Sequence, residues 1–377
     1  MAYPHQYDEY TQAMLDALEK AFDRYEGFDP NPNVSAASES SMRSFAQCAD
    51  PWNPLFNDEQ YAKNTKWGSI IAFPNYVDCI GTITIQPQID PRGGWCFNLF
   101  PGENWEFYRP VRPGDTFRVF RRRGRYEDVT RPDGSGPHIF NMVYSDCDVI
   151  NQHGEIVASW QALKSTSVLH QPKEKIQIPY HDHIYTKKEL DYLSDVIRGE
   201  TICGAVPRYW EDVAVGESLP PATIGINTTW DFVAFNCGRQ EMPGLSTRAL
   251  RDYLPPMVFD DPDTGAQRTR IEWHFVDEVA AIGGAPRAFN FGAAGMANLA
   301  RVVTNWMGDD GELRTFKWRH LHVSGAGDAI VGHARVIDKF IAENGEHLVA
   351  LDVWLDNICR GNVSESAYVT VILPSRM

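Results

Sequence analysis

The stretch that decides the fold is Asn53-Pro-Leu-Phe-Asn-Asp-Glu-Gln-Tyr-Ala62, which runs on to Ile70-Ile-Ala-Phe-Pro74. It has a loose counterpart 218 residues later, in His274-Phe-Val-Asp-Glu-Val-Ala280 and Ala288-Phe-Asn-Phe-Gly292. At this offset, Phe56 aligns with the histidine that opens the second copy. A histidine titrates near neutral pH. Its presence in one copy alone suggests that one half does chemistry while the other half shapes the site.

Helical patterns precede strand-like patterns in each half of the chain. Apolar residues recur with helical spacing over residues 10–25 and 295–306, and further helices are predicted at 187–197 and from 229 onward. Apolar and polar residues alternate, as in strands, over residues 116–121, 139–150, 156–168, 313–323, 329–341, 347–358 and 366–373. Helices followed by antiparallel strands predict an α+β fold in which a sheet wraps around a helix.

Length and charge limit the classes of protein that remain. A chain of 377 residues suits two domains, which we divide at residues 1–185 and 186–377. The formal net charge of −15 disfavours contact with a phosphate backbone, so no nucleic-acid partner is expected. The one basic run, Arg121-Arg-Arg-Gly-Arg125, is typical either of a solvated strand end or of a contact to the phosphates of a nucleotide-bearing ligand.

Cysteine and histidine spacing argue against metal sites and secretion. The seven cysteines are scattered and form no Cys-x-x-Cys pair, which favours a reducing compartment. No secretory signal and no apolar run of membrane-spanning length is visible, so a cytoplasmic protein without membrane contact is expected. The pairs His181/His183 and His320/His322 lack a third ligand, so no metal is predicted. No nucleotide-binding or dinucleotide-binding motif is present, and no cofactor is predicted.

Several segments together resemble MaoC-like (R-specific) enoyl-CoA hydratases and dehydratases. The first copy of the repeat resembles their N-terminal domain, and Arg109-Pro-Val-Arg-Pro-Gly-Asp-Thr116 resembles its strand-opening motif. Tyr209-Trp-Glu-Asp-Val-Ala-Val-Gly-Glu217 resembles the start of their C-terminal domain, and the second copy with Leu299-Ala-Arg-Val-Val-Thr-Asn-Trp306 resembles its hydratase segment. The resemblance covers roughly residues 42–165 and 205–374. It implies a double hotdog fold, in which two tandem hotdog domains each wrap an antiparallel sheet around a central helix.

The same resemblance implies syn addition or removal of water on a CoA thioester. In that chemistry an aspartate and a histidine act together as general acid and base. A backbone N–H at the start of the central helix polarises the thioester carbonyl. By resemblance, His274 takes the position of the histidine and Gly292 that of the glycine at the helix start. A homodimer or a higher homo-oligomer is expected on the same ground.

The sequence departs from the family pattern at the acid–base pair. The aspartate expected five residues before His274 is Thr269, and Phe291 replaces a histidine that often precedes the glycine. Asp277 and Glu278 lie three and four residues after His274, so on one helix they would lie beside it and replace the missing acid. Alternatively, they form a solvated helix start, which the helix dipole favours.

Other candidate residues belong to substrate binding. Asn290 is a candidate side-chain donor beside the helix start, and Phe291 lies between it and Gly292. Phe56 and Trp67 of the first half are candidates for lining an acyl pocket, with core packing as the alternative. We therefore predict a hydratase or dehydratase acting on a 2-enoyl or 3-hydroxyacyl thioester. Two alternatives remain: a noncatalytic acyl-CoA-binding or partner subunit, and a different reaction, such as thioester hydrolysis or chemistry on a substrate without CoA.

Overall fold

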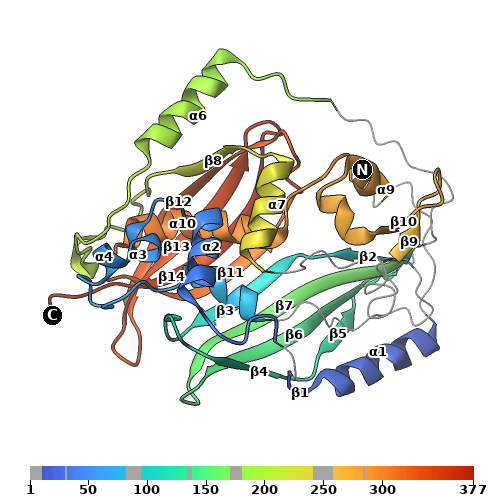
Figure 1. The fold of residues 1–377 in the computed structure, drawn as a ribbon, viewed down its shortest axis with the longest axis horizontal. Coiled ribbons are helices and arrows are strands. Elements are labelled where there is room, and N and C mark those ends of the chain that lie inside the picture. Colours follow the sequence, from blue (N-terminus) through green and yellow to red (C-terminus); the bar gives the residue numbers. More distant parts are fainter. Residues whose placement is uncertain are drawn as a thin grey trace.

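A twelve-stranded antiparallel sheet runs through both halves of the chain (Figure 1). The computed structural model describes residues 11–29, 32–81, 95–133, 138–169, 181–240, 258–282 and 285–377. The first half contributes β1 (Gly27–Phe28), β2 (Trp95–Leu99), β3 (Gly102–Phe107), β4 (Phe117–Arg121), β5 (Arg125–Asp128), β6 (Phe140–Asn151) and β7 (Ile156–Leu169). The second half contributes β8 (Ala222–Ile226), β11 (Glu312–His320), β12 (Ala329–Ile341), β13 (His347–Asn357) and β14 (Asn362–Ile372).

The order of strands shows how the halves join. The sheet runs β1-β4-β6-β7-β3-β11-β14-β13-β12-β8, while β2 pairs with β7 and β5 with β6. The halves meet where β3 pairs with β11, with Trp105 opposite Phe316. Gly102 has a φ of +139°, and a Cβ there would lie 2.0 Å from the carbonyl oxygen of Trp318. Glycine is therefore required at this junction, because any side chain would push the two strands apart.

Helices lie against one face of this sheet and outside its edges. They are α1 (Gln12–Tyr25), α2 (Glu39–Ala49), α3 (Pro54–Asn57), α4 (Glu59–Ala62), α5 (Val77–Ile80), α6 (Lys187–Gly199), α7 (Thr229–Gly238), α9 (Asp277–Ile282) and α10 (Gly292–Met307). Three 3₁₀ helices, η1 (Pro74–Tyr76), η2 (Trp210–Asp212) and η4 (Arg270–His274), complete the described set. In Figure 1, α2 lies beside α7, and α10 crosses the sheet of the second half.

The central helix of the second half is α10. Its apolar side chains, among them Met296, Leu299, Val303 and Trp306, are almost fully buried against β11 to β14. At a typical transfer free energy, each such side chain contributes about 1.5–3 kcal/mol. In the first half the corresponding position begins with η1 and α5, and residues 82–94 lie outside the described residues. Both halves therefore pack the start of a helix against an antiparallel sheet, and the predicted α+β class is confirmed.

Local signals set several helix boundaries. Thr228 begins α7 with a capping box to Asp231, and Thr186 begins α6 with a capping box to Glu189. The stretch 238–270, which has no clear periodicity, contains a separate hairpin of β9 (Val258–Asp260) and β10 (Gln267–Thr269). Residues 241–257 of this stretch lie outside the described residues. None of the described helices is long and apolar enough to cross a membrane.

Candidate functional site

His274 is the last residue of η4, and its ring is held by a backbone carbonyl. Nδ1 lies 2.8 Å from the carbonyl oxygen of Phe289. A carbonyl only accepts hydrogen bonds, so Nδ1 carries the proton and donates it. The neutral imidazole then has its lone pair on Nε2. Such a nitrogen is suited to accept a proton from water.

Aromatic rings enclose this imidazole. Phe291 stacks on it with ring centroids 3.9 Å apart, and Phe289 and Trp273 lie 4.7 and 5.7 Å away. Burial lowers the pKa of His274 to about 3, although the bond to Phe289 acts in the opposite direction. Desolvation disfavours the charged ring. His274 is therefore neutral over the physiological pH range.

In the first half the equivalent residues also contact each other, but with edge-on rings. Phe56 packs edge-on against Phe73 with ring centroids 5.3 Å apart. At the offset of 218 residues these two positions correspond to His274 and Phe291. The duplicated pattern thus corresponds to a duplicated packing arrangement. Phe56 is 2% exposed and lies in the core, as the packing alternative for this residue expects.

Beside His274 lies the N-terminus of α10. Phe291 is the N-cap residue, Gly292 begins the helix, and no side chain among the described residues caps it. The first N–H groups of a helix have no intrahelical acceptor, so they are available to an oxygen of a ligand. A Cβ at Gly292 would lie 2.7 Å from the Trp318 ring and 3.1 Å from Phe100. Glycine at this position permits close packing of Trp318 against the helix start.

Buried polar atoms near this helix start have no hydrogen-bond partner in the described part of the chain. Among them are Oδ1 of Asn290 and Nε1 of Trp273. The backbone N–H of Asn290 donates to the carbonyl of Ser324 at 3.0 Å, which fixes the segment that enters α10. Buried polar atoms normally have partners, so an unpaired acceptor and an unpaired donor mark a place where a ligand or water is expected.

Thr269 occupies the position of the missing aspartate and has a structural role. It is the N-cap of η4, and Glu272 accepts its backbone N–H at 2.9 Å in a capping box. Arg268 also donates to Glu272, at 2.6 Å. Thr269 and Glu272 therefore stabilise the short helix that ends at His274. Thr269 has no carboxylate, and the carboxylate of Glu272 is already paired with Arg268 and the Thr269 N–H.

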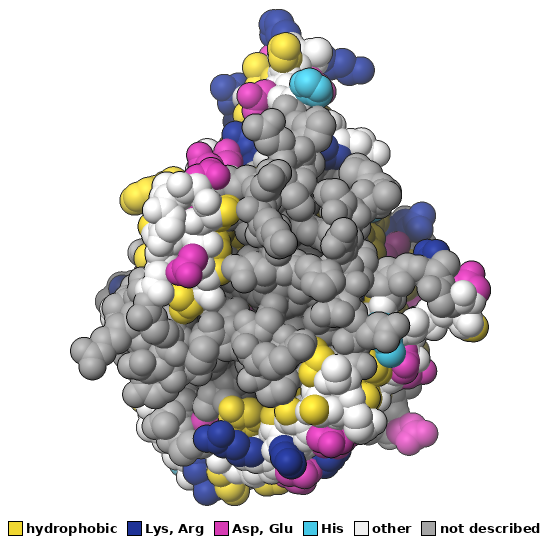
Figure 2. Space-filling view, turned by 90° about the vertical axis from the view of Figure 1, so that its right-hand side faces the viewer, with side chains coloured by type: hydrophobic (Ala, Val, Ile, Leu, Met, Phe, Trp, Pro, Cys, Tyr) yellow, Lys and Arg dark blue, Asp and Glu magenta, His cyan; other side chains and the backbone are white. Residues whose placement is uncertain are grey.

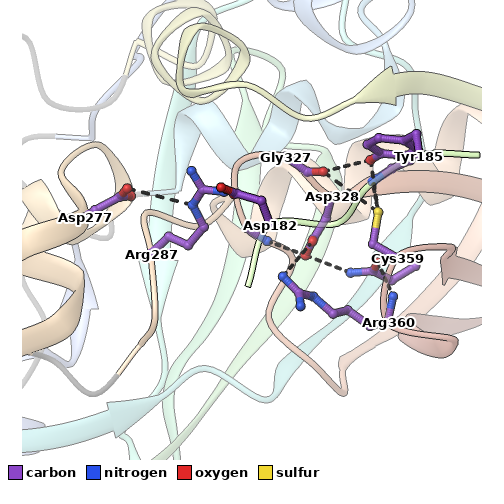
Figure 3. Close-up of polar contacts among 11 residues, drawn as sticks. Asp182, Tyr185, Asp277, Arg287, Gly327, Asp328, Cys359 and Arg360 are labelled. Atoms are coloured by element: carbon purple, nitrogen blue, oxygen red, sulfur yellow. Dashed lines mark hydrogen bonds and ion pairs between the residues drawn. The ribbon is translucent and has the colours of Figure 1, made fainter. Parts of the chain in front are cut away.

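Asp277 and Glu278 lie in the first turn of a different helix. Since η4 ends at His274 and α9 begins at Asp277, no continuous helix places them beside the imidazole. Asp277 accepts the backbone N–H of Ala288 at 2.7 Å and lies 3.8 Å from the guanidinium of Arg287, as Figure 3 shows. Glu278 is exposed. The geometry agrees with the alternative of a solvated helix start, and Asp277 also braces the loop before α10.

A second group of contacts in Figure 3 ties the segment before α6 to the loop that precedes β12. The hydroxyl of Tyr185 donates to the carbonyl of Gly327 at 2.7 Å, and Arg360 lies 3.1 Å from a carboxylate oxygen of Asp328. The other oxygen of Asp328 accepts the N–H of Gly325 at 3.0 Å. This loop pairs with the segment that leads into α10. These polar contacts therefore fix the loop before β12, which in turn pairs with the segment that leads into α10.

Trp67 lies away from His274. Its Nε1 donates to the carbonyl of Asp309 at 2.8 Å, just beyond the C-terminus of α10. A helix of the length of α10 spans about 24 Å, and Gly292 is at its opposite end. The predicted pocket-lining role of Trp67 is thus not met at this site. Its ring instead joins the two halves of the chain and carries Lys66 at 4.3 Å from its centroid.

The basic run of the first half is neutralised by carboxylates. Arg121 pairs with Asp29, Arg122 with Asp146 and Asp148, Arg123 with Glu19 and Asp23, and Arg125 with Asp146. Figure 2 shows the same mixture along its lower edge, where Lys and Arg side chains lie beside Asp and Glu side chains. The solvated strand end, and not a phosphate site, accounts for this run. No group of three potential metal ligands occurs in the described ranges.

One pair of titratable side chains near α10 was not found from the sequence. His320 ends β11, and its Nδ1 lies 3.6 Å from a carboxylate oxygen of Glu365 on β14. Glu365 is 3% exposed, and its other oxygen accepts Nε1–H of Trp318 at 2.7 Å. The sequence singled out His320 only for its spacing to His322. His320 and Glu365 are 45 positions apart in the sequence, so no local pattern indicates their contact.

Comparisons with known proteins agree with this architecture. Residues 28–160 match the family model of the FAS1-like dehydratase domain region. A solved MaoC-like dehydratase superimposes with a TM-score of 0.61 at 14% identity, covering 94% of this chain and 100% of that chain. The peroxisomal multifunctional enzyme type 2 of Drosophila melanogaster gives a TM-score of 0.51 at 12% identity, covering 95% of this chain and 51% of that chain. No curated protein sequence matches the chain.

A further solved structure establishes the duplicated architecture by name. It is a conserved hypothetical protein of Mycobacterium tuberculosis with a double hotdog fold, and it gives a TM-score of 0.50 at 11% identity over 93% of this chain and 97% of that chain. The predicted fold and the resemblance to MaoC-like dehydratases are therefore confirmed. The chain therefore has a double hotdog fold, and its residues 28–160 match the model of the FAS1-like dehydratase domain region.

Proposed function

We propose that this protein is a hydratase or dehydratase that adds or removes water on a 2-enoyl or 3-hydroxyacyl thioester, with CoA as the carrier. The observation that carries the proposal is the contact between His274 and the N-cap of α10, with ring centroids 3.9 Å apart. The contact supports the proposal because the His274 imidazole lies next to the uncapped backbone N–H groups of α10. Hydration of an enoyl thioester needs both groups at one place.

The chemistry follows from these two groups. The N–H groups at the start of α10 donate hydrogen bonds to the thioester oxygen, which gains negative charge as the enolate forms. Nε2 of His274 takes a proton from the water that attacks the β-carbon. The surrounding rings exclude bulk water, which strengthens the hydrogen bonds to the thioester oxygen. Removal of water from a 3-hydroxyacyl thioester uses the same groups in reverse.

The two halves divide the work in this proposal. The first half, with Phe56 in the place of the histidine, holds no proton acceptor at the corresponding position. It contributes apolar surface on which the acyl part lies, and the second half contributes the reacting groups. The CoA carrier and a homodimeric state are proposed from the resemblance alone. Both are open to direct measurement by substrate competition and by sedimentation.

The test is an assay of the purified protein with enoyl-CoAs, 3-hydroxyacyl-CoAs and saturated acyl-CoAs. Loss of enoyl absorbance and release of free CoA are followed in parallel. We expect His274→Gln to lower hydration by at least about 100-fold, the usual contribution of a general base. His322→Gln is the matched control, because His322 makes the same kind of bond, from Nδ1 to a backbone carbonyl at 2.9 Å, on an exposed loop.

Three outcomes would contradict the proposal. Hydration that survives His274→Gln unchanged would show that another group does the chemistry. Release of free CoA without hydration would favour thioester hydrolysis. Tight binding of acyl-CoAs with no turnover across the panel would favour a noncatalytic acyl-CoA-binding subunit.

A further inference from the structure

The repeat contains a second place where an apolar pair in the first half becomes a titratable pair in the second. Trp105 of β3 and Trp318 of β11 are related by an offset of 213 residues, and two positions further on stand Phe107 and His320. Phe107 lies opposite Ala158 in the sheet. His320 lies opposite Glu365 in the same register. Where the first half has Phe and Ala, the second half therefore has His and Glu.

This second pair lies at the helix start described above. Side chains two residues apart on a strand point to the same face, so His320 follows Trp318 on the side that faces α10. The Trp318 ring reaches Gly292 at the first position of that helix. A Cβ at Gly295 would lie 1.8 Å from a carboxylate oxygen of Glu365. Glycine at 295 thus makes room for the carboxylate against the first turn of α10.

The pair also lies within electrostatic reach of His274. After burial, electrostatic interactions with Arg239 and His320 are the further influences that lower the pKa of His274. Arg239 is 4% exposed and pairs with Asp78 of α5, so its charge is fixed. Charged groups near the two imidazoles include Arg239, which follows α7, its partner Asp78 of α5, and Glu365 of β14. The two histidines approach one site from η4 and from the end of β11.

The imidazole of His320 lies next to the carboxylate of Glu365, but the two do not form a hydrogen bond. Its Nδ1 is buried and has no hydrogen bond in the described chain, because the carboxylate oxygen of Glu365 is 3.6 Å away. Glu365 itself is held by Trp318 at 2.7 Å. Hydrogen bonds between catalytic groups are often long in the absence of substrate and shorten when it binds. Because Nδ1 is the nitrogen next to Glu365, Nε2 is the ring nitrogen left for proton transfer.

We propose that His320 is the second proton-transfer group of the site, oriented by Glu365, and that it replaces the aspartate missing at Thr269. This assignment rests on the proposed hydratase function and deepens it. In hydration, the water oxygen bonds to the β-carbon, and the proton it loses passes to Nε2 of His274. The π pair of the double bond moves through the α-carbon to the thioester oxygen, which the N–H groups of α10 hold.

Protonated His320 completes the addition. The enolate pair returns to form a bond from the α-carbon to the proton on Nε2 of His320, and that N–H bond breaks. His274 has then gained one proton and His320 has lost one. Proton exchange with water restores both imidazoles, so one water molecule has been added overall. Glu365 acts as a positioning residue, because it touches His320 and not the substrate.

The test uses two variants of the full-length protein. His320→Phe places the residue of the first half, Phe107, at the equivalent position, and we expect it to lower kcat about 100-fold or more with little change in KM. Glu365→Gln keeps an oxygen that accepts from Trp318 but lacks the negative charge beside His320. We expect it to lower kcat less and to shift the limb of the kcat/KM pH profile that reports the general acid. His322→Phe is the matched control, with unchanged kcat.

A structural role is distinguished from proton transfer by chemical rescue. Imidazole added to a His320→Ala variant is expected to restore part of kcat, and it should not restore a His322→Ala variant because that variant loses nothing. If His320→Phe does not fold, the pH profile of Glu365→Gln decides the matter. Full activity of His320→Phe, or a Glu365→Gln profile equal to that of the wild type, overturns this assignment alone. Wild-type protein that hydrates no thioester overturns the proposed function and this assignment together.

Discussion

Replacing His274 by phenylalanine imports the residue that the first half uses at the same position. The new ring would lie against Phe291 in the place of the imidazole, and the equivalent pair in the first half, Phe56 and Phe73, shows that two phenylalanines pack at these positions. The variant loses the hydrogen bond to the carbonyl of Phe289, which is worth about 1 kcal/mol. It gains apolar burial of a similar size, about 1 kcal/mol. At pH 7.5 the free energy of unfolding should therefore change by less than about 1 kcal/mol.

The unfolding free energies of the wild type and of His274→Phe should differ increasingly as the pH falls. His274 has a pKa of about 3 when folded, against 6.5 as the ordinary value. Between these values the unfolded state binds the extra proton, so wild-type stability falls as pH falls below 6.5. From pH 7.5 to pH 5.0 this loss amounts to at most about 2 kcal/mol. The His274→Phe variant has no such proton and should lack that part of the loss.

Urea unfolding at pH 7.5, 6.0 and 5.0 measures this difference. Other groups titrate in the same range, among them Asp50, whose pKa burial raises to about 6. They act equally in both proteins, so only the difference between wild type and variant is interpreted. His322→Phe, at an exposed position, serves as the control and should follow the wild type at every pH. A gap between wild type and His274→Phe that stays constant from pH 7.5 to 5.0 would refute the neutral, partly buried imidazole on which the site depends.

Three further measurements test other parts of the structure. Gly102→Ala should lower the unfolding free energy by more than about 3 kcal/mol, because φ is +139° and the new Cβ would lie 2.0 Å from the Trp318 carbonyl oxygen. The control Gly345→Ala, with open space around the residue, should lower it by only about 1 kcal/mol. Burial raises the pKa of Glu103 to about 8, so as the pH rises the unfolded state loses this proton before the folded state does. Stability should therefore fall between pH 4.5 and 8, and thermal melts of Glu103→Gln should show a melting temperature that depends less on pH across this range. Asp277→Ala removes the acceptor of a loop N–H and should cost about 1 kcal/mol while kcat is retained; a loss of kcat comparable to that of His274→Gln would restore Asp277 as an acid–base group.

Local patterns in the sequence predicted the regular elements closely. Residues 295–306 were expected as a helix and lie within α10, and residues 329–341 coincide with β12. Helical and strand periods are read over a few residues, so distant contacts do not disturb them. The hairpin of β9 and β10 has no such period. Its turn depends on Asp261, whose carboxylate accepts two backbone N–H groups, and a side-chain turn of this kind does not appear as periodicity.

The candidate site was only half accessible to the same reasoning. His274 could be located because the repeat fixes its register against Phe56. Asp277 and Glu278 were placed beside it by assuming one helix, but the chain changes from η4 to α9 between them. Glu365 lies far from His320 in the sequence, and only the antiparallel register of β11 and β14 brings them together. Pairings across a sheet are nonlocal, so spacing within one sequence cannot reveal them.

The duplication suggests why acid–base chemistry would be confined to one half although both halves contain buried carboxyl groups. Glu103 of the first half is 1% exposed, and its two oxygens accept the indole N–H groups of Trp105 and Trp160 at 2.8 and 3.1 Å. A carboxyl group enclosed in this way has no oxygen left for a substrate, whatever its protonation state. Glu365 gives only one oxygen to an indole and turns the other toward His320. Both halves therefore contain a buried carboxyl group, and they differ in whether that group contacts an imidazole. Of the two, only Glu365, in the half proposed to react, lies next to one.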